Sequence, residues 1–322
     1  MPGHGSKEMK KKSSKRSRSA KKLTPATRVL RYELTNSANA GTETSHYIDI
    51  ARDLSRVNRR LYRQGRDYHV KKITIVSSNT PNGGNRVSAA TMGTGWVTQM
   101  AWKRGFQTWN KMNAEATKQL AGNIAGTWSD FKVSLTPEFR VASKLAPRDN
   151  GGNAYLGGEW SYTVLVTPDG TATDDEFQLT MLGDHIGAAG ARTSVALVKS
   201  YGESRATVQN NDPNVPSVAS ADPLVNVFDY GTTIDDVIDN LETSNDSAPY
   251  DVYNYPGSDL NAPKPIIMQD STLVDGRSVM GGFIARCGMI EFEAKSAIPN
   301  DTFSVLVELA PGNYRGIKAD VI

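Results

Sequence analysis

Closely spaced cations near the N-terminus are the residues in this sequence with the clearest chemical meaning. Segment 7–22 reads KEMKKKSSKRSRSAKK, and its only apolar side chains are Met9 and Ala20. Cations on a flexible chain suit phosphates, because each neutralised phosphate releases condensed counterions without requiring a fixed geometry. We predict that this segment is disordered when free, since it has no apolar face to bury. Its expected nucleic-acid-binding residues are Lys7, Lys10, Lys11, Lys12, Lys15, Arg16, Arg18, Lys21 and Lys22.

Charge is unevenly distributed along the chain. Residues 1–31 carry eleven Lys or Arg and one acid, Glu8, giving +10; the whole chain carries +3, which leaves −7 for the other 291 residues. We therefore expect a basic nucleic-acid-binding arm over residues 1–43 and a folded body over residues 44–322. The arm also has the composition of a nuclear localisation signal. A solvated tail without a partner is an alternative, whereas a mitochondrial transit peptide is disfavoured because the Lys-rich run is not amphipathic.

A second candidate for phosphate binding is Ile50–Gln64, IARDLSRVNRRLYRQ, which we predict to be a helix stopped by Gly65. At 100° per residue, its apolar and basic side chains fall on opposite faces. The apolar face holds Ile50, Leu54, Val57 and Leu61. The basic face holds Arg52, Arg56, Arg59 and Arg63, and Asp53, the only acid in the segment, lies off it. We predict that the four arginines contact a polyanion from fixed positions; an ordinary solvated face is the alternative.

Residue patterns that signal catalysis or metal binding are missing. The four histidines are scattered, without an HExxH or HxH pair, and one cysteine cannot form a zinc-cysteine cluster. There is no GxSxG elbow and no phosphate-binding GxxxxGK[ST] loop, and Gly93–Gly95 supplies only GxG. The acids near Asp169–Glu176 lack the spacing of an EF-hand and are expected to be a polar loop. We therefore expect no enzymatic activity, no cofactor and no metal.

Short apolar runs separated by turn residues fill the body. At 322 residues, with 38% hydrophobic and 22% charged residues, the chain can bury a substantial core. Loops such as Thr80–Asn85 (TPNGGN) and Pro147–Gly152 (PRDNGG) carry the turn residues. The expected strands are Tyr68–Ser77, Trp128–Leu135, Glu159–Thr167, Glu176–Met181, Arg192–Lys199, Val279–Glu293 and Phe303–Leu309. This pattern predicts a mainly β fold, a single antiparallel jelly-roll sandwich with a few helices in its loops.

Helical patterns interrupt the strands. In Val97–Leu120 the side chains of Trp102, Phe106, Trp109, Ala116 and Leu120 recur at helical spacing. This aromatic stripe could stack nucleobases, but core packing against a sheet is the preferred interpretation. A short helix is also expected at Thr232–Glu242, with its acids in solvent.

The single cysteine and the lengths of the apolar runs bear on disulfide formation and on membrane association. Cys287 is the only cysteine, so no intrachain disulfide forms, and its apolar run favours a small buried residue over a link between subunits. No apolar run approaches the ~18 residues of a membrane span, and the N-terminus lacks a secretory h-region. We expect no membrane association.

The arm followed by NRRLYRQGRDYHV (Asn58–Val70) and WKRGFQTWNKM (Trp102–Met112) resembles the coat proteins of small circular single-stranded DNA viruses that encode a replication initiator. The likeness is to their unclassified and marine members, and is clearest over residues 1–135. It implies a jelly-roll subunit, an icosahedral shell of about sixty copies, and packaging of circular single-stranded DNA. It further implies assembly in the host nucleus through an import receptor, a virion as the final location, and an unidentified host-cell receptor. Sixty arms of +10 would bring about 600 charges to a genome of order a thousand phosphates.

Three alternatives stay open at this point. A positive-strand RNA virus coat protein would share the whole plan, because a Lys/Arg arm does not distinguish DNA from RNA. A cellular nucleic-acid-binding β protein with a basic tail would be monomeric or dimeric. An enzyme with distant catalytic residues is the least favoured.

Overall fold

The structure, a computed structural model, describes residues 24–78, 84–119, 128–167, 175–188, 192–204, 258–259, 262–273 and 275–322. The expected arm residues 7–22 and the expected helix Thr232–Glu242 lie outside these ranges, as do Asp169 and Asp174. What the structure describes is mainly β, with antiparallel sheets packed as a sandwich and a few helices, as the sequence predicted.

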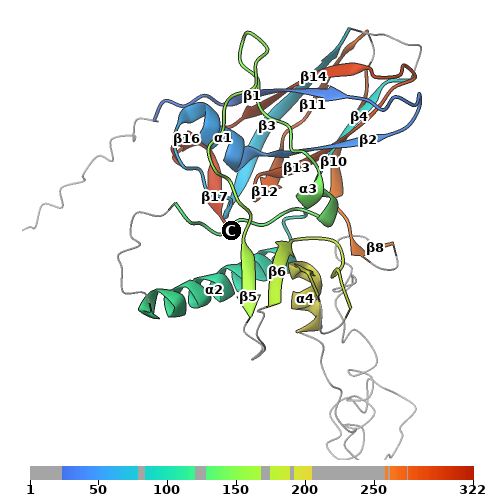
Figure 1. The fold of residues 1–322 in the computed structure, drawn as a ribbon. Helices are drawn as coiled ribbons and strands as arrows, with labels where there is room; N and C mark the ends of the chain where they lie inside the picture. The colour runs from blue at the N-terminus through green and yellow to red at the C-terminus, as the bar shows by residue number, and fades with distance from the viewer. Residues whose placement is uncertain are drawn as a thin grey trace, which may run out of the picture.

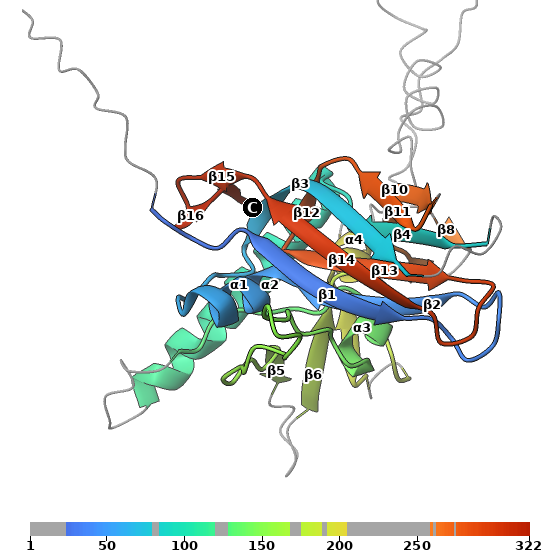
Figure 2. The same ribbon diagram turned by 90° about the horizontal axis from the view of Figure 1, so that it is seen from above.

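Two sheets form the sandwich (Figures 1 and 2). The first has the order β1 (Val29–Thr35), β14 (Thr302–Leu309), β3 (Arg66–Ser77), β11 (Arg277–Met280), and β3 also pairs with β12 (Phe283–Arg286) and β17 (Ala319–Val321). The second has the order β10 (Ile266–Thr272), β4 (Arg86–Thr91), β13 (Met289–Lys295), β2 (Thr44–Asp49). The strands of the sandwich can be numbered 1 to 8 in chain order as β1, β2, β3, β4, β10, β11 together with β12, β13 and β14. The first sheet then has the order 1-8-3-6 and the second has the order 5-4-7-2. That alternation of strands between two antiparallel sheets is the jelly roll.

Strict alternation explains why the first sheet forms. In β14, Phe303, Val305, Val307 and Leu309 point inward with no exposed surface, and the residues between them face outward. Figure 2 looks onto that outward face, which no other described element covers. The sandwich core lies between the two sheets and includes Tyr32, Tyr68 and Phe292.

The structure corrects two boundaries in this region. β1 pairs along its whole length with β14, so the body starts by Val29 rather than at residue 44. The single strand expected at Val279–Glu293 is divided among three strands: Gly281 and Gly282 separate β11 from β12, and Cys287 (φ 58°) and Gly288 (φ 71°) form a tight turn between β12 and β13. Tyr68–Ser77 and Phe303–Leu309 are confirmed as β3 and β14.

A long insertion, residues 92–265, separates β4 from β10. Most of its described helices and strands lie below the sandwich in Figure 1, while residues 142–163 run up along the sandwich, where the backbone N–H of Arg148 donates to the Arg31 carbonyl at 2.8 Å. Its described elements are α2 (Trp96–Gln119), α3 (Pro137–Val141), β5 (Val164–Thr167), β6 (Asp175–Thr180), β7 (Ser194–Ala196), α4 (Leu197–Glu203), β8 (Ser258–Asp259) and β9 (Ala262–Pro263). It has its own core, which includes Trp102, Phe131, Leu179 and Met181 and reaches Met289 of the jelly roll.

Some of the helices and strands predicted within the insertion are confirmed, and others are shorter, divided or wrong. The long helix is confirmed as α2, and the strand expected at Glu176–Met181 is confirmed as β6. Glu159–Thr167 forms a strand only over β5, and Arg192–Lys199 divides into β7 and the start of α4. Trp128–Leu135 is wrong as a strand: it is extended, but makes only a bridge from Ser134 to Thr180. Its alternate apolar residues are buried in the insertion core instead.

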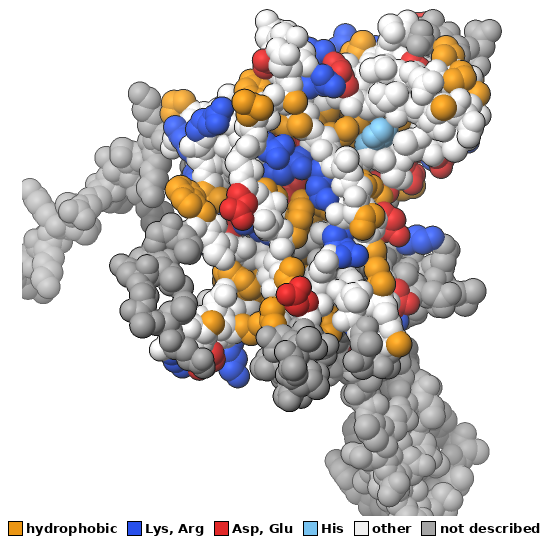
Figure 3. Space-filling model, viewed as in Figure 1, with side chains coloured by type: hydrophobic (Ala, Val, Ile, Leu, Met, Phe, Trp, Pro, Cys, Tyr) orange, Lys and Arg blue, Asp and Glu red, His pale blue; other side chains and the backbone are white. Residues whose placement is uncertain are grey.

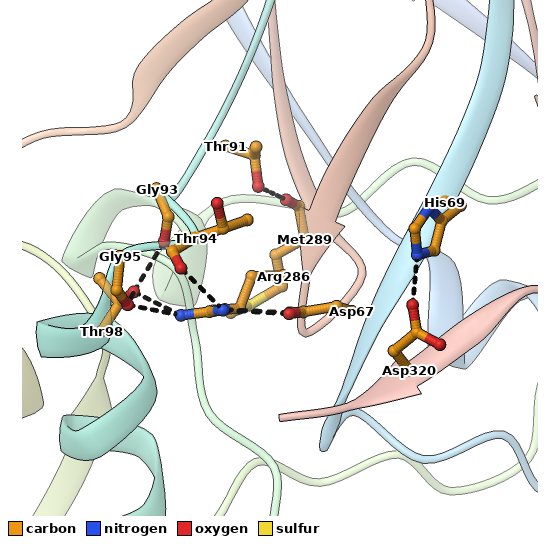
Figure 4. Close-up of polar contacts among 10 residues, drawn as sticks. All are labelled: Asp67, His69, Thr91, Gly93, Thr94, Gly95, Thr98, Arg286, Met289 and Asp320. Atoms are coloured by element: carbon orange, nitrogen blue, oxygen red, sulfur yellow. Dashed lines mark hydrogen bonds and ion pairs between the residues drawn. The ribbon is translucent and has the colours of Figure 1, made fainter.

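A buried arginine fastens the insertion to the jelly roll (Figure 4). The Arg286 guanidinium donates to both carboxylate oxygens of Asp67, at 2.9 and 3.0 Å, to the carbonyls of Thr94 and Gly95, and to the hydroxyl of Thr98. All five of its N–H groups are thereby satisfied. The Gly93–Gly95 string is therefore a structural acceptor for Arg286. Beside it, His69 and Asp320 form a 2.6 Å contact that joins β17 to β3 (Figure 4).

Candidate nucleic-acid interface

The described chain begins at Thr24 against α1 (Ile50–Asn58) and the strand β16 (Gly316–Ile317), which pairs with β15 (Pro311–Gly312) (Figure 1). The side chain of Asn58, the last residue of α1, accepts from the backbone N–H of Thr27 at 2.7 Å and donates to its carbonyl at 3.1 Å. The Arg60 guanidinium donates to the carbonyl of Pro25 at 3.1 Å. The place where the basic arm leaves the body is thus fixed by contacts with the end of α1.

Arginines surround this place, and all of them except the half-buried Arg66 are exposed. The guanidinium carbon of Arg66 lies 3.7 Å from the ring centre of Tyr314, and that of Arg315 lies 5.9 Å from it. The Tyr314 hydroxyl accepts from the backbone N–H of Arg63 at 3.0 Å, and the Arg315 guanidinium donates to the carbonyl of Leu61. We call this group the arm-base cluster; it comprises Arg28, Arg59, Arg60, Arg63, Arg66 and Arg315, with Tyr314 at its centre.

Few acids offset this charge. Within the described ranges, the only carboxylate that pairs with a member of the arm-base cluster is Asp130, 3.6 Å from Arg63, whose side chain is still 60% exposed. Burial raises the pKa of Asp130, and the nearby Arg63 charge partly opposes that rise. Other acids close in sequence are engaged elsewhere: Asp67 by Arg286 and Asp320 by His69. Figure 3 shows Lys and Arg side chains near the junction of the N-terminal segment and across the middle of that face.

The predicted arginine face over Ile50–Gln64 is wrong as a single helix face. α1 ends at Asn58, and Arg59 takes a left-handed conformation (φ 53°, ψ 40°), so the chain turns away six residues before Gly65. Arg59 and Arg63 are exposed and belong to the arm-base cluster. Arg56 is half-buried and packs over Gly157, and burial lowers its pKa. Leu61, expected on the apolar face of this helix, lies beyond its end.

Arg52 is part of the interior. It is 6% exposed, its Nε donates to Asp53 at 2.8 Å, and its Nη2 donates to the carbonyl of Leu145. Burial opposes the charge on Arg52, but the attraction of Asp53 outweighs this and raises the pKa of the guanidinium. Arg52 therefore cannot belong to an exposed phosphate-binding face in this fold.

Two buried carboxylates complete that interior network. Asp49 caps α1 by accepting from the backbone N–H of Arg52 at 3.1 Å. Its second oxygen accepts from Gln64, Trp160 and Tyr162 at 2.9, 3.0 and 3.2 Å. Asp53 accepts from the Tyr32 hydroxyl at 2.8 Å, and burial raises the pKa of Asp53 to about 6. The network joins α1 to β1 and to the insertion.

Several sequence expectations concern single residues. Cys287 is buried, and burial raises the pKa of its thiol well above the usual value. Trp102 lies in the core as expected, while Phe106 and Trp109 are only partly buried beside it, and Ala116 is exposed. Among the described residues, no group of three or more His, Cys, Asp or Glu is placed to hold a metal ion. None of the helices in the described ranges is both long and apolar enough to cross a membrane.

Sequence reasoning missed Arg60, Arg66, Arg315 and Tyr314. The density of arginine in NRRLYRQGR (Asn58–Arg66) was a usable signal for the first two. Nothing local signals Arg315 or Tyr314, because only the fold of the C-terminal segment brings them to α1.

Comparisons of the chain with protein-family models, with curated proteins and with solved structures found no match. The likeness to viral coat proteins therefore stays a prediction, and function has to be argued from the residues and their arrangement.

Proposed function

We propose that this protein is a viral coat protein that assembles into a closed icosahedral shell and packages single-stranded nucleic acid through its basic N-terminal arm. One observation carries the proposal: the basic arm joins the jelly-roll body beside the arginines of the arm-base cluster. Arg60 and Asn58 hold the chain at Pro25 and Thr27, directly after the nine cations of segment 7–22.

Charge distribution supports this division of labour. The arm supplies many cations on a chain with no apolar face, which suits phosphates of any sequence. Five of the six arginines of the cluster are exposed, at fixed positions beside the arm's exit, and the half-buried Arg66 stacks on Tyr314. Nucleic acid held by the arm would therefore meet further phosphate contacts where the arm joins the shell. The net charge of −7 over the residues after Arg31 suits a shell whose other surfaces should not adhere to nucleic acid.

The proposed copy number, genome type and nuclear localisation come from the resemblance to coat proteins of small circular single-stranded DNA viruses. The shell would contain about sixty copies, the genome would be circular single-stranded DNA, and the arm would also act as the nuclear localisation signal that an import receptor binds. The virion and the host nucleus are the proposed locations. An RNA genome is the competing possibility, and the arm's chemistry favours neither.

Electron microscopy of the purified full chain tests the proposal, with and without added circular single-stranded DNA. We expect closed particles of uniform size that contain nuclease-protected nucleic acid and survive a reducing agent, because Cys287 is buried. Digestion of the recovered nucleic acid with DNase or with RNase identifies the genome type. A monomer or dimer that never assembles would overturn the proposal and favour a cellular binding protein.

A further inference from the structure

A cavity of about 420 Å³ lies next to the arm-base cluster, between α2 and the C-terminal end of the chain. Figure 1 places the C-terminus above the first half of α2, which agrees with this position. Its floor is aromatic, from Trp102, Phe106 and Phe131, and its rim carries Arg63, Arg66 and Lys103. An aromatic floor under a cationic rim is the arrangement that single-strand-binding proteins use for one base and its phosphates.

The aromatic rings of the floor pack on one another, and one of them carries a buried donor without an acceptor among the described residues. Trp102 stacks on Phe106 with ring centres 5.3 Å apart and planes within 7°, and meets Phe131 edge-on at 5.6 Å. Trp102 is only 8% exposed, and its buried indole N–H has no acceptor among the described residues. A buried donor without an acceptor costs free energy, which the packing of Trp102 against Phe106 and Phe131 has to offset.

Gly65 brings the backbone close to this indole. A Cβ at Gly65 would lie 2.6 Å from Cη2 and 2.7 Å from Cζ2 of Trp102, and Cζ2 is two bonds from the indole nitrogen. Gly65 also lines the cavity, so the benzo edge of Trp102 forms part of its wall. A larger residue at position 65 would push into that wall.

We infer that this cavity binds one nucleotide of the packaged strand. The base occupies the space over Phe106 and the edge of Trp102, and the flanking phosphates lie against Arg66 and Lys103. Asp130 is the one acidic side chain of the lining and it pairs with Arg63, while Arg66, which donates to the Ala319 carbonyl at 3.4 Å, and Lys103 have no carboxylate side chain as partner among the described residues. This inference rests on the proposed function. It adds that the folded body contacts a base of the packaged strand, whereas the arm contacts only its phosphates.

Filling the cavity from an exposed position provides the test. Gln107 lines the cavity and is exposed on α2, so Gln107→Trp places bulk in it without removing a core side chain. Asn110→Trp is the matched control, because Asn110 is exposed on the same helix and is not among the residues that line this cavity. The full chain is titrated with a thymidine oligonucleotide and with an abasic oligonucleotide of equal length at one salt concentration. Both oligonucleotides carry the same number of phosphates, so the contribution of the arm's phosphate contacts is the same in both dissociation constants. The ratio of the two constants therefore reports the contribution of the base.

We expect the wild-type protein and Asn110→Trp to prefer the thymidine strand about tenfold, which corresponds to one stacked base. Gln107→Trp should lower this preference nearly to one and leave abasic binding unchanged. An unaltered preference in Gln107→Trp would overturn the inference, as would equal binding of both strands by the wild-type protein; either result leaves the proposed packaging intact. Failure of the wild-type protein to bind either strand would instead overturn the proposed function itself.

A second measurement does not depend on any variant folding. Thymidine 5′-monophosphate and deoxyribose 5-phosphate carry the same phosphate, and only the first has a base. Calorimetry on the wild-type protein should detect saturable binding of the nucleotide and much weaker binding of the sugar phosphate. Equal binding of the two compounds would show a phosphate site alone and would overturn the inference.

Discussion

Arg52 and Arg63 come from one short arginine-rich stretch and end in opposite environments. The guanidinium of Arg52 is enclosed by Asp53 and the Leu145 carbonyl, with 7% of its side chain exposed. The side chain of Arg63 is 60% exposed, with Asp130 at 3.6 Å as its carboxylate partner. The difference arises at Arg59, where a left-handed residue ends α1 and sends the following arginines towards the C-terminal segment. Spacing alone therefore does not assign arginines to one surface; the residue that ends the helix decides which face they share.

Removing the enclosed guanidinium should have the largest effect on stability. Arg52→Gln leaves Asp53 buried without its cation, and breaking a buried pair from one side costs about 3–5 kcal/mol. Urea denaturation measures the loss. Arg59→Gln is the control and should change stability by less than about 0.5 kcal/mol, since Arg59 is exposed. If both variants lost a similar free energy of unfolding, the buried and the exposed arginines would not differ in their contribution to stability.

The enclosed pair should also leave a signature in the pH dependence of stability. Asp53 has a pKa of about 6 in the folded protein against 3.8 as its ordinary value, so between these pH values the folded state binds a proton that the unfolded state has released. This group's contribution therefore makes the protein more stable as pH falls from about 6 towards 3.8, by up to about 1.4 kcal/mol per pH unit. The stability difference between wild type and Asp53→Asn should shift with pH in that window. A difference that is flat across it would mean that Arg52 keeps Asp53 ionised at an ordinary pKa.

How far the sequence could predict the molecule follows from the range of the interactions involved. Alternation of buried and exposed residues is local, so β3, β14 and the jelly-roll class were predictable. The aromatic spacing of α2 was also local. The end of α1 was not: it depends on Arg59 in a left-handed conformation and on Ser55, whose hydroxyl accepts from the backbone N–H of Tyr62 at 2.8 Å.

Long-range contacts account for what the sequence missed at the candidate site. Tyr314 and Arg315 reach the arm-base cluster only because the Tyr62 hydroxyl donates to the Arg315 carbonyl and the Tyr314 hydroxyl accepts from Arg63. β7 and the start of α4 likewise share an apolar run whose division is set by packing against β6 and α2. Neither relation leaves a periodic signal in the sequence.

The exposed arginines should matter least for folding and should act on binding instead. Arg28→Gln, Arg59→Gln and Arg63→Gln together remove three exposed charges of the arm-base cluster, so thermal stability should stay nearly unchanged. If all three contact phosphate, the log–log salt dependence of single-strand binding should become shallower by about 2, which is 0.7 for each contact. The matched control changes Lys71, Lys72 and Arg277 to Gln, three exposed cations of the first sheet, and should leave the slope as it is. A control that flattens the slope equally would show that phosphate binding follows net charge rather than position. An unchanged slope in the cluster variant would mean that packaging depends on the arm alone and that these arginines are ordinary surface.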